Sequence, residues 1–405
     1  MRDVAKDWRY AADNESQTDS RRYILDGRGR LGPQALRLLI PLPEGTSYNA
    51  YLVEGSSKTA LLDTVDPSMY HQLEAQLASV EHLDYVIAHH GEQDHSGSIP
   101  AVLARYPEAT AVCSPKCKPM LIDLLHVAEE RIAVVDDGGS IDLGGRTLKF
   151  VHAPWVHWPE TMLTYVPEDK ILFTCDFLGS HLAMSELFST GRPREREAAK
   201  RYFAEIMMPF SNLIVKNLDK IEGLEVDIVA PSHGPVVSDP GYITRCYREW
   251  SAGPMRNKVC LPYVSMHGST RVMVDALVSA LVSRSVQVER FELTGSDLGN
   301  VAMSLVDSAT VVIGTPTVLG GAHPAASHLA LLANALRPRT KFVSVLCSYS
   351  WGGRAVEQIS GLIGNLRAEV LEPVVCKGLP RSGDLQAVER LADQIAEKHR
   401  ELGLV

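Results

Sequence analysis

The sequence predicts an α/β protein of two domains, in which a layered α/β sandwich precedes a doubly wound parallel sheet. The length of 405 residues suits two domains better than one. Strand-like segments fall in two groups before residue 250, whereas strand-like and helix-like segments alternate strictly after residue 258. The stretch SAGPMRN (251–257) separates the two patterns. We therefore expect domains over residues 1–250 and 258–405.

The first domain contains two groups of strand-like segments with helical patterns between them. The first group is LRLLIPLP (36–43), YNAYLVEG (48–55), KTALLDTV (58–65) and DYVIA (84–88). The second group is two hairpins, over 140–154 and 161–176, and the run VDIVA (226–230). Helical patterns cover 68–80, 97–106 and 116–128, and an amphipathic segment covers 195–221. Two strand groups with intervening helices are typical of a layered sandwich.

The second domain alternates five strand-like runs with helical stretches. The runs are KVCLPYVS (258–265), VQVERFEL (286–293), ATVVIGTP (309–316), KFVSVLCS (341–348) and EVLEPVVC (369–376). Five such units within residues 258–405 predict a parallel sheet of strand order 2-1-3-4-5, which binds ligands between strands one and three.

Composition excludes several classes of partner. The net charge is −9 and the sequence has no cluster of lysine or arginine, so we expect neither nucleic acid nor a membrane as a partner. No apolar run approaches the roughly 20 residues of a membrane span. The start of the chain, MRDVAKDWRYAADNES, has no apolar core of the signal-peptide type, which predicts a cytoplasmic protein.

The seven cysteines are scattered and form no C-x-x-C motif, which is typical of free thiols in a reducing compartment. Cys113 and Cys117 are four residues apart, so a disulfide or a metal site at this pair stays open.

Metal-capable side chains gather in the sequence HHGEQDHSG (89–97), directly after a strand-like run. His90, Glu92, Asp94 and His95 lie within six positions, and such a loop can serve two metal ions. Further candidates follow other strands of the first domain, namely His157, Asp176 and His233. A lone loop histidine is usually solvated, but four ligands with three partners at strand ends predict a metal centre. His89, His152 and His181 are expected to lie outside the ligand set or to orient a ligand.

The spacing resembles the metallo-β-lactamase superfamily, whose usual motif is His-x-His-x-Asp-His and which often binds zinc. Here Glu92 replaces the second histidine. A carboxylate is a harder, anionic ligand, so Glu92 favours iron over zinc. Two ferrous ions with three carboxylates and one bridging hydroxide would be electrically neutral, and two metals about 3.5–4 Å apart could hold a small ligand.

Three loops of the second domain predict a flavin mononucleotide (FMN) site. SMHGST (265–270) offers hydroxyls and a helix N-terminus for a phosphate, whereas neither an ATP-type nor a dinucleotide-type glycine motif is present. GTPTVLGG (314–321) and CSYSWGG (347–353) follow the neighbouring strands, and Tyr349 or Trp351 could flank the flavin ring. A half-buried packing role is the alternative for Trp351. The candidate residues are Ser265, Met266, His267, Gly268, Ser269, Thr270, Pro316, Thr317, Val318, Leu319, Gly320, Ser348, Tyr349, Ser350, Trp351, Gly352 and Gly353.

The combination of these two signatures resembles the flavodiiron proteins, or A-type flavoproteins, over nearly the whole chain. The resemblance implies an N-terminal metallo-β-lactamase-like αββα sandwich and a C-terminal flavodoxin-like doubly wound sheet. It implies that one iron is held by His90, Glu92 and His157, the other by Asp94, His95 and His233, with Asp176 as the bridge. The implied activity is reduction of dioxygen to water or of nitric oxide to nitrous oxide, in a head-to-tail homodimer or a dimer of dimers.

Some positions depart from the family pattern. Glu160-Thr161-Met162 replaces the usual Asp-Ser-Met, and residues 181–200 are hard to align. Tyr202 and His181 are candidate catalytic residues near the irons. The chain reaches residue 405 without paired C-x-x-C motifs, so we expect an external electron donor: a rubredoxin, a reduced deazaflavin coenzyme or a nicotinamide-linked reductase.

The sequence does not rank the two gases, and dioxygen is favoured slightly because nothing marks specialisation for nitric oxide. Two other functions remain open. One is a zinc-dependent hydrolase of the metallo-β-lactamase superfamily with a fused flavodoxin domain, against which Glu92 argues. The other is an electron-transfer or sensing module with a vestigial metal site, against which the seven filled ligand positions argue. Metal identity discriminates between them.

Overall fold

The computed structural model describes residues 25–27 and 41–405, and these divide into two compact units. One unit takes Leu42–Tyr202 and Phe210–Ser251, and the other takes Phe203–Pro209 and Ala252–Val405. Most of the strand expected over 36–43 lies outside the described residues, and 41–43 are not in a strand.

The first unit contains two sheets. The six-stranded sheet runs in chain order: β1 (Leu25–Gly27), β2 (Tyr48–Glu54), β3 (Thr59–Leu62), β4 (Tyr85–Ala88), β5 (Thr110–Cys113) and β6 (Ile132–Val134). The five-stranded sheet has the order β11-β10-β9-β8-β7: β7 (Ser140–Asp142), β8 (Thr147–His152), β9 (Met162–Val166), β10 (Ile171–Cys175) and β11 (Ile228–Pro231). Strands β3 to β6 are parallel, and so are β10 and β11.

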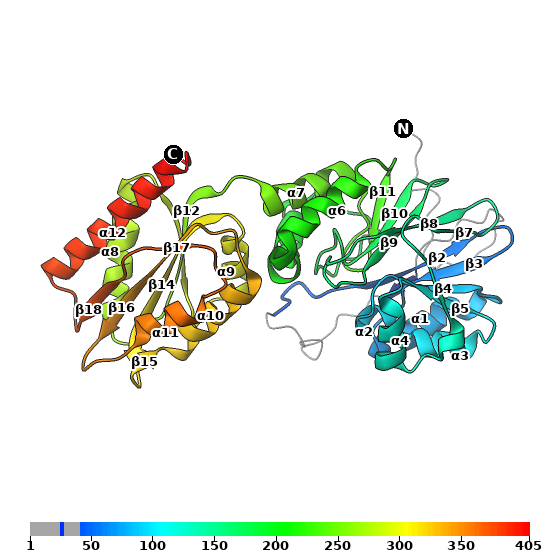
Figure 1. The fold of residues 1–405 in the computed structure, drawn as a ribbon, viewed down its shortest axis with the longest axis horizontal. Helices are drawn as coiled ribbons and strands as arrows, with labels where there is room; N and C mark the ends of the chain where they lie inside the picture. Colours follow the sequence, from blue (N-terminus) through cyan, green and yellow to red (C-terminus); the bar gives the residue numbers. More distant parts are fainter. Residues whose placement is uncertain (1–24, 28–40) are drawn as a thin grey trace. The chain divides into compact units, whose positions relative to one another are not determined.

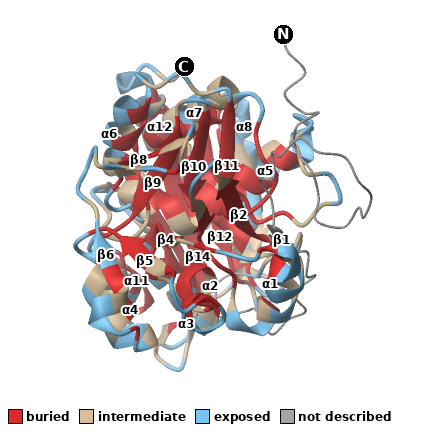
Figure 2. Ribbon diagram, turned by 90° about the vertical axis from the view of Figure 1, so that its right-hand side faces the viewer, coloured by how far each residue is buried: buried red, intermediate tan, exposed pale blue. Residues whose placement is uncertain are grey.

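The two sheets pack face to face around one apolar layer. Val53, Leu62 and Ile87 from the first sheet meet Phe150 and Phe173 from the second, all of them buried. Helices cover the outer faces (Figure 1): α1 (Tyr70–Gln76), α3 (Ile99–Arg105) and α4 (Cys117–Leu125) on the first sheet, α6 (Ser211–Ile221) and α7 (Pro240–Ala252) on the second. This is the expected αββα sandwich, and the strands are mostly buried (Figure 2).

The amphipathic segment over 195–221 is not one helix. It consists of α5 (Pro193–Tyr202), a π-helical turn (Phe203–Met207), a 3-10 turn (Met208–Phe210) and α6. Pro209 cannot donate a backbone hydrogen bond, which favours a break at this point.

The second unit has the predicted doubly wound sheet. Its order is β13-β12-β14-β16-β17, which is 2-1-3-4-5 in order of appearance, with β15 on β14 and β18 on β16. The strands are β12 (Arg256–Tyr263), β13 (Gln287–Glu292), β14 (Ser308–Val318), β15 (Gly321–Ala322), β16 (Phe342–Tyr349), β17 (Glu369–Val370) and β18 (Val374–Lys377). The fifth expected strand is split into β17 and β18, and Pro373 lies in the gap.

Helices cover both faces of this sheet (Figure 1). On one face lie α8 (Ser269–Ser283) and α12 (Ser382–Glu401), and on the other lie α9 (Leu298–Leu305), α10 (Pro324–Leu336) and α11 (Ala355–Leu362). The apolar core on the first face includes Leu261, Leu277 and Ile395. Across the part of the chain that the structure describes, no helix is long and apolar enough to cross a membrane.

Candidate metal centre and flavin loops

The loop that carries the first four metal candidates is shaped by local hydrogen bonds. Strand β4 ends at Ala88, and the short helix α2 (Gln93–Ser96) begins five residues later. The hydroxyl of Ser96 donates to the carbonyl oxygen of Gly91 at 2.8 Å, which closes the loop on itself. His90 and His95 are each 1% exposed. Their rings lie 5.5 Å apart between centroids, so the loop brings both imidazoles to one place.

The other three candidates come from strand ends of the second sheet. His157 follows β8, Asp176 follows β10 directly, and His233 lies two residues after β11. Because β10 and β11 are parallel, their carboxyl ends share one edge. Gly234 has a φ of +81°, and a Cβ atom there would lie 2.2 Å from the Ser180 hydroxyl oxygen, so only glycine fits beside His233.

Asp176 stands between two sets of ligands. Its Oδ2 lies 3.1 Å from His157 Nε2 and 3.6 Å from His90 Nε2. Glu92 completes this set, with Oε2 at 3.1 Å from His90 Nε2 and 3.3 Å from His157 Nε2.

The other oxygen of Asp176 faces the second set. Oδ1 lies 3.0 Å from His95 Nε2 and 3.2 Å from His233 Nε2. Asp94 completes this set, with Oδ2 at 3.4 Å from His233 Nε2. The structure thus brings together all seven predicted ligands, three on each side of one carboxylate.

Several buried polar atoms at the centre lack a well-aligned hydrogen bond, which fits metal binding. Asp94 Oδ1, His95 Nε2 and Asp176 Oδ1 face one another at ion-pair distance, but none of them forms a well-aligned hydrogen bond among the described residues. Buried polar atoms are almost always satisfied, so such a group needs a further partner. Four imidazoles and three carboxylates, converging as two groups, suit two metal ions, and the share of hard oxygen ligands favours iron.

The electrostatics of the metal-free site also indicate cation binding. Burial lowers the pKa of His90, but hydrogen bonds to Glu160 and Glu92 and the charge of Asp176 raise it to about 10. Burial raises the pKa of Asp176, but the charge of His95 and the hydrogen bonds of the facing histidines hold it well below its usual value. The carboxylates therefore stay anionic and attract positive charge, which protons supply when metal is absent.

Two further contacts orient ligand rings so that Nε2 faces the centre. Glu160 Oε1 lies 2.8 Å from His90 Nδ1 and accepts the backbone N–H of Gly91 at 2.9 Å. His233 Nδ1 lies 2.8 Å from the carbonyl oxygen of Ser47, to which it can only donate. Such partners fix the tautomer and orientation of a ligating histidine.

Two of the three histidines expected outside the ligand set make structural contacts. His89 Nδ1 lies 2.8 Å from Asp63 Oδ2, and its Nε2 lies 2.7 Å from the Thr164 hydroxyl oxygen. His152 Nε2 lies 3.1 Å from the carbonyl oxygen of Val135. Both rings are used in the sandwich itself.

His181 and Tyr202 lie beside His233. The ring centroids of His181 and Tyr202 are 4.6 Å apart, and that of His181 is 5.4 Å from His233. Burial and the charge of His233 lower the pKa of His181 to about 3, so its ring is neutral, and its Nδ1 has no hydrogen-bond partner among the described residues. Burial and the charge of Asp176 raise the pKa of Tyr202 well above its usual value, so the phenol keeps its proton.

The first predicted flavin loop joins β12 to α8. Gly268 precedes the helix with a φ of +91°, a conformation that favours glycine. The Ser265 hydroxyl oxygen accepts the backbone N–H of Arg271 at 3.2 Å. The hydroxyl oxygens of Thr270 and Ser348 lie 2.8 Å apart, so the first and third loops are in contact.

The other two flavin loops follow β14 and β16, whose register places Pro316 beside Ser348. Backbone N–H of Arg354 donates to Gly320 at 2.9 Å, which joins these loops. Leu319 is 95% exposed and Trp351 is 78% exposed. The alternative reading of Trp351 as a half-buried packing residue is therefore wrong. Exposed apolar side chains at this edge leave surface available for a ligand or a partner.

Sequence reasoning missed the residues that position the ligands. Glu160 departs from the family pattern, and nothing in the sequence shows that its carboxylate contacts His90. Ser47 contributes only a backbone carbonyl, for which the sequence carries no signal. Cys113 and Cys117 are both free thiols, so the possibility of a disulfide at this pair is not realised in this structure.

Comparisons with known proteins cover both the metal centre and the unit that carries the flavin loops. Residues 46–234 match a family model described as ODP family beta lactamase. The chain is 35% identical over 364 residues to a nitric oxide reductase of Moorella thermoacetica, covering 87% of this chain and 91% of that protein.

Two solved structures extend the likeness over both units. Rubredoxin oxygen:oxidoreductase from Desulfovibrio gigas has a TM-score of 0.85 at 26% identity and covers 90% of this chain and 93% of that one. The flavodiiron protein from Giardia intestinalis has a TM-score of 0.83 at 26% identity and covers 94% of each chain. The candidate ligands form two sets of three around Asp176, the second unit is flavodoxin-like, and the relatives match along both units. This chain therefore belongs to the flavodiiron, or type A flavoprotein, family.

Proposed function

We propose that this protein reduces dioxygen to water or nitric oxide to nitrous oxide, as a flavodiiron oxidoreductase with two iron ions and FMN. One observation carries the proposal: the two carboxylate oxygens of Asp176 each face a separate set of three ligands. Two metals bridged in this way can act together on one small molecule.

The ligand sets are assigned as the resemblance implies. His90, Glu92 and His157 would hold one iron, Asp94, His95 and His233 the other, with Asp176 between them. When bound, iron supplies one-electron chemistry toward the gas, and FMN supplies electrons from a donor. The protein's own role is to fix the orientation of the ligand rings: Glu160 would hold His90, and the Ser47 carbonyl would hold His233.

His181 and Tyr202 are proposed to handle protons. Reduction of dioxygen to two waters takes four electrons and four protons, and reduction of two nitric oxide molecules takes two of each. Tyr202 is 1% exposed and keeps its phenolic proton, and the neutral His181 beside it can relay a proton by gaining one at one ring nitrogen as it loses one from the other. Their contact with each other and with His233 supports this role.

The first unit would be the diiron domain and the second the FMN domain. The loop over 265–270 would hold the phosphate, and the loops after β14 and β16 would hold the flavin ring, with Trp351 or Tyr349 against it. The contact between Thr270 and Ser348 supports one continuous site. The exposure of Trp351 supports a role in binding rather than in packing.

Assembly, donor and location are proposed together. A head-to-tail homodimer, alone or paired as a tetramer, would bring the flavin of one subunit to the irons of its partner. Electrons would come from an external carrier such as a rubredoxin, a reduced deazaflavin coenzyme or a nicotinamide-linked reductase. All seven cysteines are free and buried, which supports a reducing, cytoplasmic environment.

The zinc hydrolase alternative has less support. The matched relatives include oxidoreductases along both halves of the chain, and Glu92 adds a third carboxylate to the ligand set. Consumption of dioxygen and of nitric oxide should therefore be measured in separate assays on protein reduced by a chemical donor, with the nitric oxide assay kept free of oxygen. Turnover of at least one gas is expected, and hydrolysis of an ester or amide with no gas turnover would contradict the proposal.

A further inference from the structure

Glu195 lies in the first turn of α5 and accepts hydrogen bonds from three consecutive residues of the preceding loop. Ser189 donates through its hydroxyl, and Gly191 donates its N–H at 3.1 Å. Thr190 donates its N–H at 3.0 Å and its hydroxyl at 2.6 Å. Glu195 is only 8% exposed as a residue, and a carboxylate that accepts from four donors holds its partners firmly.

The loop that Glu195 holds is also tied to the segment that carries His233. Backbone N–H of Ser189 donates to Val236 at 2.7 Å, and backbone N–H of Val236 donates to Leu187 at 2.9 Å. Further back in the same loop, Ser180 donates its N–H to the His233 carbonyl oxygen at 3.1 Å. The loop carries His181, so its placement determines where that ring lies beside His233.

Helix α5 links the same carboxylate to Tyr202. Glu195 lies near the start of the helix and Tyr202 is its last residue, so the two are about two turns, or roughly 10 Å, apart along one rigid element. Glu195 therefore joins the helix of Tyr202 to the loop of His181, and these two rings meet beside His233 at 4.6 Å between centroids.

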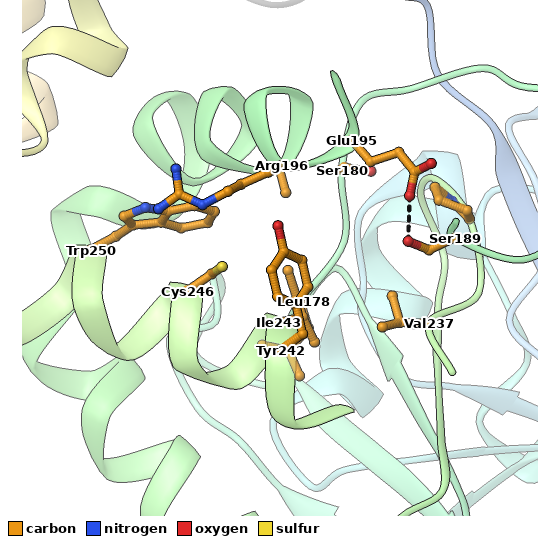
Figure 3. Close-up of a pocket in the computed structure, with 12 residues that line it drawn as sticks. Leu178, Ser180, Ser189, Glu195, Arg196, Val237, Tyr242, Ile243, Cys246 and Trp250 are labelled. Carbon is orange, nitrogen blue, oxygen red and sulfur yellow. Dashed lines mark hydrogen bonds between the residues drawn. The ribbon is translucent and has the colours of Figure 1, made fainter. Parts of the chain in front are cut away.

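A small cavity lies beside the carboxylate of Glu195 and the loop that it holds (Figure 3). A cavity of about 30 Å³ is lined by Glu195, Ser189, Ser180 and Trp250, among others. The Arg196 guanidinium lies over the Trp250 ring at 5.7 Å on the far wall. This cavity leaves the loop room to shift if the carboxylate is lost. Close packing would not then hold the loop in place of the lost hydrogen bonds.

We propose that Glu195 is a positioning residue that holds His181 and Tyr202 together against His233, and that its carboxylate is needed for full turnover though it lies outside the ligand set. This rests on the proposed proton-handling role of the pair. Loss of the carboxylate should slow the reaction without removing a ligand, since misplacement of a reacting group by about 1 Å can cost on the order of 100-fold in rate.

The test compares Glu195→Gln with Glu197→Gln, an exposed glutamate on the same helix. Glutamine keeps the shape but turns an amide N–H₂ toward donors. We expect kcat for gas reduction to fall about 10- to 100-fold in Glu195→Gln, with unchanged KM for the gas and unchanged iron content, and no change in Glu197→Gln. Thr190→Val, which removes a single donor, should give a smaller loss of kcat and serves if Glu195→Gln does not fold.

A double-mutant cycle separates positioning from general stability. If Glu195 acts through the pair, Glu195→Gln should cost far less in a Tyr202→Phe background than in the wild type. Equal costs in both backgrounds, a loss of iron that matches the loss of kcat, or a kcat equal to that of Glu197→Gln would each overturn the proposal. A wild-type protein that reduces neither gas would instead overturn the proposed function, and the role of Glu195 with it.

Discussion

Replacing Glu160 with alanine should weaken one iron position and spare the other. Glu160 is 2% exposed, and its Oε1 contacts both His90 Nδ1 at 2.8 Å and the Gly91 N–H at 2.9 Å. Its removal frees the His90 ring to rotate or to change tautomer. The iron position that contains His233 does not depend on Glu160. His233 Nδ1 is oriented by the backbone carbonyl of Ser47, which the substitution leaves in place.

Two independent estimates of the effect agree. Removing a partner that orients a metal ligand typically costs about 10- to 100-fold in metal affinity, which is roughly 1.4–2.8 kcal/mol. A hydrogen bond to a charged group is worth about 1.5–3 kcal/mol, the same range. We therefore expect Glu160→Ala to lower the affinity of the His90 position by about 10- to 100-fold and to leave the His233 position nearly unchanged.

The assay is anaerobic competition with a chelator, followed by the iron remaining per chain. The wild type should lose both irons in one range of chelator concentration, whereas Glu160→Ala should lose one iron at about 10- to 100-fold lower concentration than the other. Glu81→Ala, at an exposed glutamate, is the control. Equal loss of both irons, or a curve identical to that of the wild type, would refute the reasoning.

Three further predictions follow from the same geometry. Asp176→Ala removes the oxygens that face both ligand sets, so gas reduction should be abolished while FMN stays bound; unchanged turnover, measured with flavin absorbance as the control, would sink the bridging assignment. In chelator-stripped protein, the folded-state pKa of His90 is about 10 against a usual 6.5, so its contribution to stability is complete below pH 6.5 and is lost as pH rises toward 10. The thermal midpoint should therefore fall across that window, and a rising midpoint would contradict this. Trp351→Ala should lower FMN content or affinity without lowering the thermal midpoint of the flavin-free protein, because the side chain is 78% exposed; full flavin retention would show that Trp351 does not contact the ring.

Much of the fold and the ligand set could be predicted because the signals are local. Strands such as β9 and β10 are buried along their whole length and mostly apolar, and the candidate ligands follow strand ends or lie in one short loop. The strand order of the second unit follows from strict alternation and is confirmed by the observed pairing.

The positioning contacts could not be predicted because they join distant segments. Glu160 and His90 are 70 residues apart, and His233 meets a backbone carbonyl 186 residues away. The break of the segment over 195–221 was likewise hidden, because its amphipathic pattern continues across Pro209. Local pattern specifies which residues point inward, and only the fold specifies which of them meet.

The most direct test of the whole account is the iron, zinc and flavin content of protein purified without oxygen. The account predicts two irons and one FMN per chain, with little zinc. Zinc in both positions with little iron, in protein expressed with ample iron, would contradict the reading of Glu92 and of the oxidoreductase function.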